Sequence, residues 1–66
     1  MKLSVDQAAD ALYLRLDESE IVESEEVSPG VVLDYNRVGE VVGVELLRLS
    51  ERSADLNLSA IQVETA

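Results

Sequence analysis

The chain has 66 residues, of which fourteen are Asp or Glu and five are Lys or Arg, so its formal net charge is −9. It contains no cysteine and no histidine, which excludes disulfides, thiolate metal sites and histidine-based acid–base chemistry. A chain of this length supports one domain of marginal stability, and its negative charge disfavours nucleic acid and anionic membranes as partners.

Two further exclusions follow from the apolar residues. No apolar run approaches the length that spans a bilayer, and residues 1–6 lack the apolar stretch of a secretory signal, so the expected compartment is the cytoplasm. There is no Phe and no Trp, so the core must be aliphatic. With disulfides excluded, association with another chain is the remaining way to stabilise so small a core.

The first half of the chain predicts two strands joined by a turn. Alternating apolar residues place these strands at 2–6 and 11–16, with three leucines of the second strand on one face. Residues 7–10 are predicted to form a short turn. A helix capped by Asp6 fits the same residues and stays open as an alternative.

Three more strands are predicted over residues 20–27, 31–36 and 40–48. The first of these is acidic at residues 23–26, which suits a charged edge strand, although a loop is the alternative. Pro29-Gly30 is typical of a tight turn between this strand and the next.

The hairpin between the last two strands has a testable register. Residues 36–39 are interpreted as a four-residue loop that pairs Tyr35 with Glu40. Leu33 then lies opposite Val42, and the apolar faces of the two strands meet.

After residue 50 the pattern changes. Residues 50–54 are interpreted as a polar connector, and Asp55 is predicted to cap a short helix over 56–62 that covers part of the apolar face. The expected fold is α+β but mainly β: an antiparallel β-meander of about five strands with a short C-terminal helix. It forms one domain over residues 1–66, with its core at about 2–50 and a C-terminal segment at 51–66.

Several motifs resemble those of a known family. They are Lys2-Leu3-Ser4-Val5-Asp6 with residues 9–16, then Glu25-Glu26-Val27, residues 30–35 and residues 41–47. In order and spacing they are similar to the YuzE-like group of small bacterial and archaeal domains of unknown function (DUF2283-type), over about residues 2–50.

The resemblance implies a compact β-rich fold in a cytoplasmic prokaryotic protein with no established activity and no catalytic residues to carry over. It also implies, for some members, a small basic toxin-like partner, and hence an antitoxin-like role. The chain departs from the pattern at Gln7, where Pro is usual, and at residues 36–39, where the loop is usually acidic.

The carboxylates suggest chemistry only weakly. The acidic run Asp17-Glu18-Ser19-Glu20, with Glu23, Glu25 and Glu26, could bind a divalent cation, but its spacing fits no known loop and a solvated face is preferred. Asp6 and Asp10 could act as paired carboxylates, but turn chemistry is preferred. We therefore expect no metal, no cofactor and no enzymatic activity.

A candidate interaction surface lies on the side of the sheet opposite the apolar stripe. This surface combines polar side chains with outward-facing apolar ones, and it includes tyrosine and arginine, which are enriched at protein interfaces. The predicted surface comprises Tyr13, Arg15, Asp34, Val41, Glu45 and Leu47.

Two functions from different classes fit the sequence. The preferred one is a non-catalytic protein-binding domain, an acidic antitoxin-like partner of a small basic protein. The alternative is a small enzyme or divalent-metal-binding domain that uses Asp and Glu. Since one short helix cannot cover the whole sheet, we also expect a homo-oligomer, with a dimer favoured.

Overall fold

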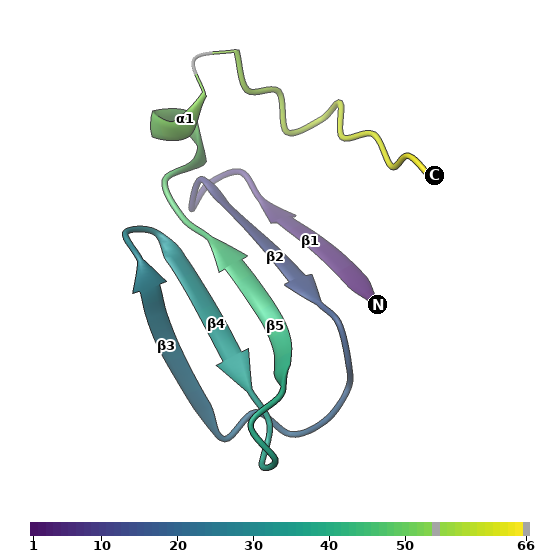
Figure 1. The fold of residues 1–66 in the computed structure, drawn as a ribbon. Helices are drawn as coiled ribbons and strands as arrows, with labels where there is room; N and C mark the ends of the chain where they lie inside the picture. Colours follow the sequence, from purple (N-terminus) through teal and green to yellow (C-terminus); the bar gives the residue numbers. More distant parts are fainter. Residues whose placement is uncertain (54, 66) are drawn as a thin grey trace.

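The computed structural model describes residues 1–53 and 55–65, which form a five-stranded antiparallel sheet followed by a short helix (Figure 1). The elements are β1 (Lys2–Asp6), β2 (Ala11–Arg15), β3 (Glu23–Ser28), β4 (Val31–Tyr35), β5 (Val41–Leu46) and α1 (Leu49–Arg52). The mainly β fold, the antiparallel strands and the short helix towards the C-terminus are confirmed. Within the described residues, no helix is long and apolar enough to cross a membrane.

The order of the strands differs from the predicted meander. Neighbouring strands run β1-β2-β5-β4-β3, so β3, β4 and β5 form a meander while β2 lies beside β5 (Figure 1). The connection over residues 16–22 therefore crosses to the far edge of the sheet. Sequential pairing would place the acidic strand β3 at the centre of the sheet, whereas a charged strand is suited to an edge.

The register gives the sheet two distinct faces. On one side, which we call the apolar face, two cross-strand rows line up as Leu3–Leu14–Val44–Leu33 and Val5–Leu12–Leu46–Val31. On the other side, the polar face, the rows are Ser4–Tyr13–Glu45–Val32 and Lys2–Arg15–Gly43–Asp34. The two rows of the apolar face contain apolar residues throughout, as expected when alternation along every strand matches the pleat, whereas the rows of the polar face also include Val32 and Gly43.

The predicted register of β4 against β5 is wrong by two residues. Leu33 lies opposite Val44 instead of Val42. One residue of the shift comes from a shorter loop, because the Asn36 amide donates to the Glu40 carbonyl at 3.0 Å. The other comes from a bulge where the register changes between Asp34 and Tyr35. A shift of two leaves each side chain on its own face, so the apolar faces still meet as predicted.

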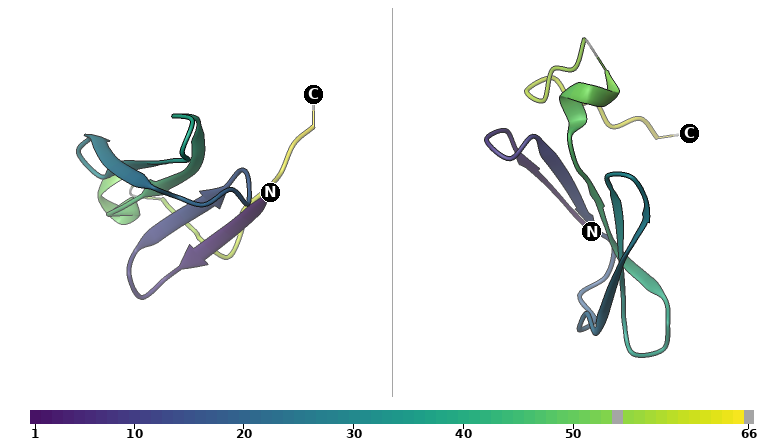
Figure 2. Two further views of the ribbon diagram at one scale, coloured as in Figure 1. Left: turned by 90° about the horizontal axis from the view of Figure 1, so that it is seen from below. Right: turned by 90° about the vertical axis from the view of Figure 1, so that its left-hand side faces the viewer.

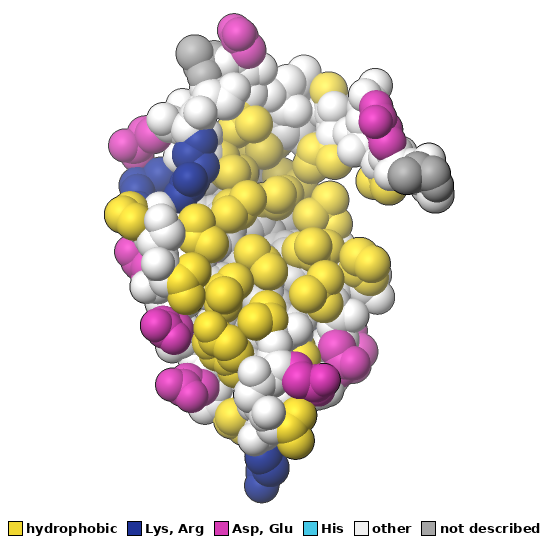
Figure 3. Space-filling view, viewed as in Figure 1, with side chains coloured by type: hydrophobic (Ala, Val, Ile, Leu, Met, Phe, Trp, Pro, Cys, Tyr) yellow, Lys and Arg dark blue, Asp and Glu magenta, His cyan; other side chains and the backbone are white. Residues whose placement is uncertain are grey.

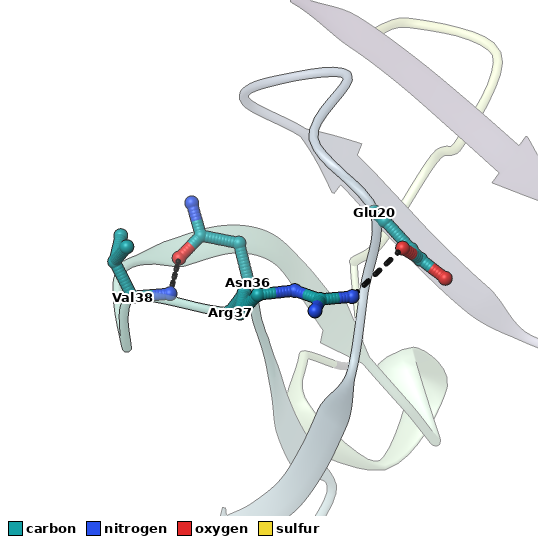
Figure 4. Close-up of polar contacts among 4 residues, drawn as sticks. All are labelled: Glu20, Asn36, Arg37 and Val38. Carbon is teal, nitrogen blue, oxygen red and sulfur yellow. Dashed lines mark hydrogen bonds and ion pairs between the residues drawn. The ribbon is translucent and has the colours of Figure 1, made fainter.

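The side chain of Asn36 accounts for the shorter loop (Figure 4). This buried side chain accepts the backbone N–H of Val38 at 3.2 Å and that of Glu40 at 3.0 Å, and donates to the Glu40 carboxylate at 3.1 Å. Gly39 closes the loop with φ 85°, a value that favours glycine. Arg37 at the tip lies 3.6 Å from Glu20, and both side chains are exposed, so this ion pair adds little stability.

Residues 7–10 form the predicted turn and not the alternative helix. The Asp10 amide donates to the Gln7 carbonyl at 3.2 Å, and Asp6 Oδ1 accepts the Ala9 amide at 3.0 Å. Asp10 has φ 56°, in the left-handed region that Asp tolerates better than most residues. The interpretation as a turn-forming carboxylate is confirmed for Asp6, whereas Asp10 is a turn residue whose carboxylate bonds the distant Ser50.

The helix does not lie where it was predicted. Residues 56–62 are not helical, and α1 begins instead at Leu49, running into the predicted connector 50–54, of which residue 54 lies outside the described residues. The reason is a cap from a distant turn: both carboxylate oxygens of Asp10 lie 3.1 Å from the Ser50 amide, and the Asp10 carbonyl accepts the Leu49 amide at 3.0 Å. These bonds satisfy amides that the start of a helix leaves unpaired.

Burial is limited because the sheet is a single twisted layer (Figure 2). In the described part of the chain, the buried apolar side chains are Val42, 2% exposed, and Leu49, 6% exposed. Helix α1 lies beyond the end of β5 and leaves the apolar face open (Figures 1 and 3). The predicted helical cover of that face is therefore missing.

Candidate functional site

A hydrogen-bonded cluster crosses the polar face from β2 to β3. The Tyr13 hydroxyl donates to Asp34 Oδ2 at 2.7 Å, and the Ser24 hydroxyl donates to Asp34 Oδ1 at 2.6 Å. Strand β5 lies between Tyr13 and Asp34, and the ring crosses it over Gly43. A Cβ at position 43 would overlap the Tyr13 hydroxyl and lie 2.9 Å from Asp34 Oδ2, so glycine is what allows this contact.

The surroundings of Tyr13 keep its hydroxyl protonated. Burial raises the pKa of Tyr13 above its usual value of 10.0, and the hydrogen bond to Asp34 raises the pKa further, while Arg15 opposes the shift. A phenol that keeps its proton donates it to the carboxylate oxygen that it faces. The cluster is therefore a stable donor–acceptor pair at neutral pH, which gives it a structural role in holding β2 and β4 across β5.

A shallow hollow of about 350 Å³ lies beside this cluster. Tyr13, Glu45 and Leu47 of the predicted interaction surface line the hollow, together with Asp6 at the end of β1. Asp34 joins them through its bond to Tyr13. Four of the six predicted surface residues thus come together on one part of the polar face.

The other two predicted surface residues lie apart from the hollow. The guanidinium of Arg15 turns towards the β2–β3 connection, where it donates to the carbonyls of Asp17 and Ser19. Val41 is at the start of β5 opposite Tyr35, next to the bulge, and is 38% exposed. Whether the six residues bind a partner stays a prediction.

The acidic run does not converge on a point. The Asp17 carboxylate accepts both the hydroxyl and the amide of Ser19, and these bonds hold the pKa of Asp17 below its usual value. Glu20 lies near Arg37. Among the residues that the structure describes, no three acidic side chains are placed to share a metal ion.

The most extended surface feature is the apolar face. Figure 3 shows apolar side chains gathered across the middle of this face, with acidic side chains along its lower left and lower right borders. Its outer members are well exposed, with Leu3 at 42%, Val5 at 37% and Leu16 at 40%. In β3 the row ends at Glu25, which pairs with Leu33 and places a carboxylate at the border.

Sequence reasoning identified the apolar stripe but missed two contacts that shape the site. The bond between Tyr13 and Asp34 joins strands that were not expected to be near one another, and its one signal was a glycine inside a β-branched strand. The cap that Asp10 gives to α1 spans 40 positions and had no local signal.

Taken together, these features define a small acidic domain built on a single-layer antiparallel sheet with one open apolar face. The chain belongs to the family described as "Protein of unknown function (DUF2283)", whose model matches residues 2–50. Neither a search of curated proteins nor a search of solved structures finds a match to the chain.

Proposed function

We propose that this chain is a non-catalytic protein-binding domain whose apolar face is covered by a basic partner protein. It would then be the acidic, antitoxin-like half of a two-protein pair. The observation that supports the proposal is the continuous apolar face, made of the rows Leu3–Leu14–Val44–Leu33 and Val5–Leu12–Leu46–Val31, which α1 leaves open.

An open apolar face of this kind is costly for a small domain. Apolar side chains that stay in water forgo about 25 cal/mol for each Å² they would bury, and a chain this short has few other sources of stability. Val42 and Leu49 are the buried apolar side chains of the described residues. A contiguous exposed apolar surface rimmed by polar groups is the usual mark of a protein interface.

The charge pattern supports a basic partner. The net charge of −9 attracts cationic proteins and speeds their association. Carboxylates also border the apolar face itself, including Glu25 at the β3 end of one row. A surface with an apolar stripe flanked by Lys and Arg complements both features, and its binding should weaken as salt increases.

A catalytic role has less support. The sequence lacks His and Cys, and the carboxylate of Asp34 already accepts hydrogen bonds from Tyr13 and Ser24 on its two oxygens.

We also propose that copies of the chain associate with one another. The hollow on the polar face, with Tyr13, Glu45 and Leu47, remains the alternative place for a partner.

Two adjacent residues of β4 provide a matched test. Leu33 lies on the apolar face and Val32 on the polar face, and both are half-buried. We expect immobilised wild-type chain and Val32→Asp to retain the same basic protein from an extract of the native host, and to release it at high salt. Leu33→Asp carries the same added charge and should lose that protein. Equal retention by both variants, or loss of the basic protein by Val32→Asp alone, would show that the protein does not bind at the apolar face.

A further inference from the structure

The two edges of the sheet are protected to different degrees. At one edge, β3 carries Glu23, Glu25 and Glu26, and a bulge between Glu26 and Ser28 interrupts its pairing. Charges and bulges on an edge strand prevent it from pairing with another chain. At the other edge, β1 is a regular strand, is exposed along its whole length, and has β2 as its one neighbour among the strands described.

The sequence of β1 is complementary to itself. The strand reads Lys2-Leu3-Ser4-Val5-Asp6. In an antiparallel pair of two such strands centred on Ser4, Lys2 of each copy lies opposite Asp6 of the other. Leu3 lies opposite Val5 in the same way. Every charge then faces its opposite, and every apolar residue faces an apolar residue.

We propose that two copies of the chain pair through β1, antiparallel and centred on Ser4, to form one continuous sheet. The proposal deepens the self-association put forward under the proposed function. Cross-strand pairs of opposite charge and of apolar side chains stabilise such a ladder, and directly opposite like charges destabilise it.

The side chains of β1 are available for this contact. Lys2 lies opposite Arg15 within its own hairpin, a like-charge neighbour that favours a carboxylate from elsewhere. Among the described residues, the ion pair present joins Arg37 to Glu20, so Lys2 has no such partner among these residues. Asp6 uses Oδ1 for the Ala9 amide, which leaves Oδ2 for an ammonium group.

The symmetry of the pair has a consequence for the apolar face. A two-fold axis perpendicular to the sheet at Ser4 keeps the same face of both copies on the same side. Leu3 and Val5 at the seam lie on the apolar face, so the apolar rows of the two copies run on into one another. The dimer therefore presents one apolar surface of twice the extent to a partner protein. The acidic β3 strands become its two outer edges, which stops further growth.

Charge reversal at each end of β1 tests the register. In Lys2→Glu, two Glu–Asp contacts replace the two ion pairs, and in Asp6→Lys, two Lys–Lys contacts do so. Each variant alone should dimerise about tenfold or more weakly than wild type in sedimentation velocity. Mixed in equal amounts, the two variants form a heterodimer. In it, the introduced glutamate of one copy lies opposite the introduced lysine of the other. The native Lys2 of the second copy lies opposite the native Asp6 of the first. Both ion pairs are then restored, so the mixture should recover the wild-type dimer.

Arg37→Glu is the matched control, since it changes the net charge by the same amount as Lys2→Glu at a site away from β1, and it should dimerise as wild type does. Circular dichroism checks that each variant is folded. A wild-type chain that stays monomeric up to millimolar concentration overturns the proposal, as does a mixture no more dimeric than its components. The retention experiment with Val32→Asp and Leu33→Asp tests the proposed binding of a basic protein separately. The dimer proposal and the partner-binding proposal can therefore fail independently.

Discussion

Tyr13 and Asp34 are 21 positions apart and on strands that are not neighbours, yet their side chains meet at 2.7 Å across β5. The contact exists because residue 43, which lies between them, has no side chain. It links the N-terminal hairpin to the β3–β4–β5 meander on the polar face. The same contact occupies the polar groups of two residues that would otherwise be free to bind a partner there.

The first prediction concerns the space over Gly43. Gly43→Ala should displace the Tyr13 hydroxyl and destabilise the fold by about 1–2 kcal/mol, the size of a hydrogen bond to a charged group that is partly exposed. Tyr13→Phe should cost a similar amount. In the double variant the costs should not add, because the hydroxyl that the new Cβ displaces is already absent. Urea unfolding of the four proteins measures this coupling, and additive costs would show that Gly43 does not act through Tyr13.

The second prediction is a loss of stability in alkali. The folded chain holds the pKa of Tyr13 above 10.0, chiefly through burial and then through the bond to Asp34. The fold thus favours the protonated phenol, so this contribution is complete below pH 10 and is lost as pH rises through the folded pKa. Melting temperatures between pH 8 and 11.5 should fall more steeply for wild type than for Tyr13→Phe. Parallel curves would mean that Tyr13 titrates as it does in the unfolded chain.

The third prediction concerns the cap of α1. Asp10→Ala removes the acceptor of the Ser50 amide and hydroxyl and places Ala at φ 56°, so it should destabilise the fold by about 1–2 kcal/mol. Asp10→Asn keeps an acceptor oxygen and tolerates the left-handed conformation, and should cost less than half as much. Hydrogen exchange at the Leu49 and Ser50 amides provides the readout. Unchanged exchange in Asp10→Ala would contradict the cap.

The fourth prediction addresses the metal-binding alternative. Because the described acidic side chains form no group of three and Asp17 is bonded to Ser19, calcium or manganese should find no shared site. Millimolar concentrations of either ion should leave the melting temperature within a degree of the value in sodium chloride of matched ionic strength. A saturable rise of several degrees would restore the alternative.

Much of the fold could be predicted because it depends on local alternation. The leucines of β2 and the valines of β4 and β5 mark strands by their period of two, and the turn at 7–10 has its own side-chain acceptor in Asp6. Those signals lie within a few residues of the structure they specify. The strand order depends instead on contacts between distant residues. Strand β2 pairs with β5 through Leu14 opposite Val44 and Leu12 opposite Leu46, about 30 positions away.

The errors also have physical causes. The four-residue loop was inferred without the buried side chain of Asn36, which accepts two backbone amides and shortens the loop. The helix at 56–62 was inferred from spacing alone, whereas a helix so short needs an outside partner, and the partner present is Asp10 beside Ser50. The candidate surface was assigned to the correct face for Tyr13, Asp34 and Glu45, but the sequence could not show that Tyr13 and Asp34 bind each other.

The most direct measurement of the central claim is photo-crosslinking in the native host, with p-benzoylphenylalanine placed at position 33 or at position 32. Position 33 lies in the apolar row beside Val44, and position 32 lies on the opposite face beside Glu45. We expect a crosslink to a basic protein from position 33 and little or none from position 32. The absence of any crosslink from position 33, or equal crosslinking from both, would contradict an apolar face that a partner protein covers.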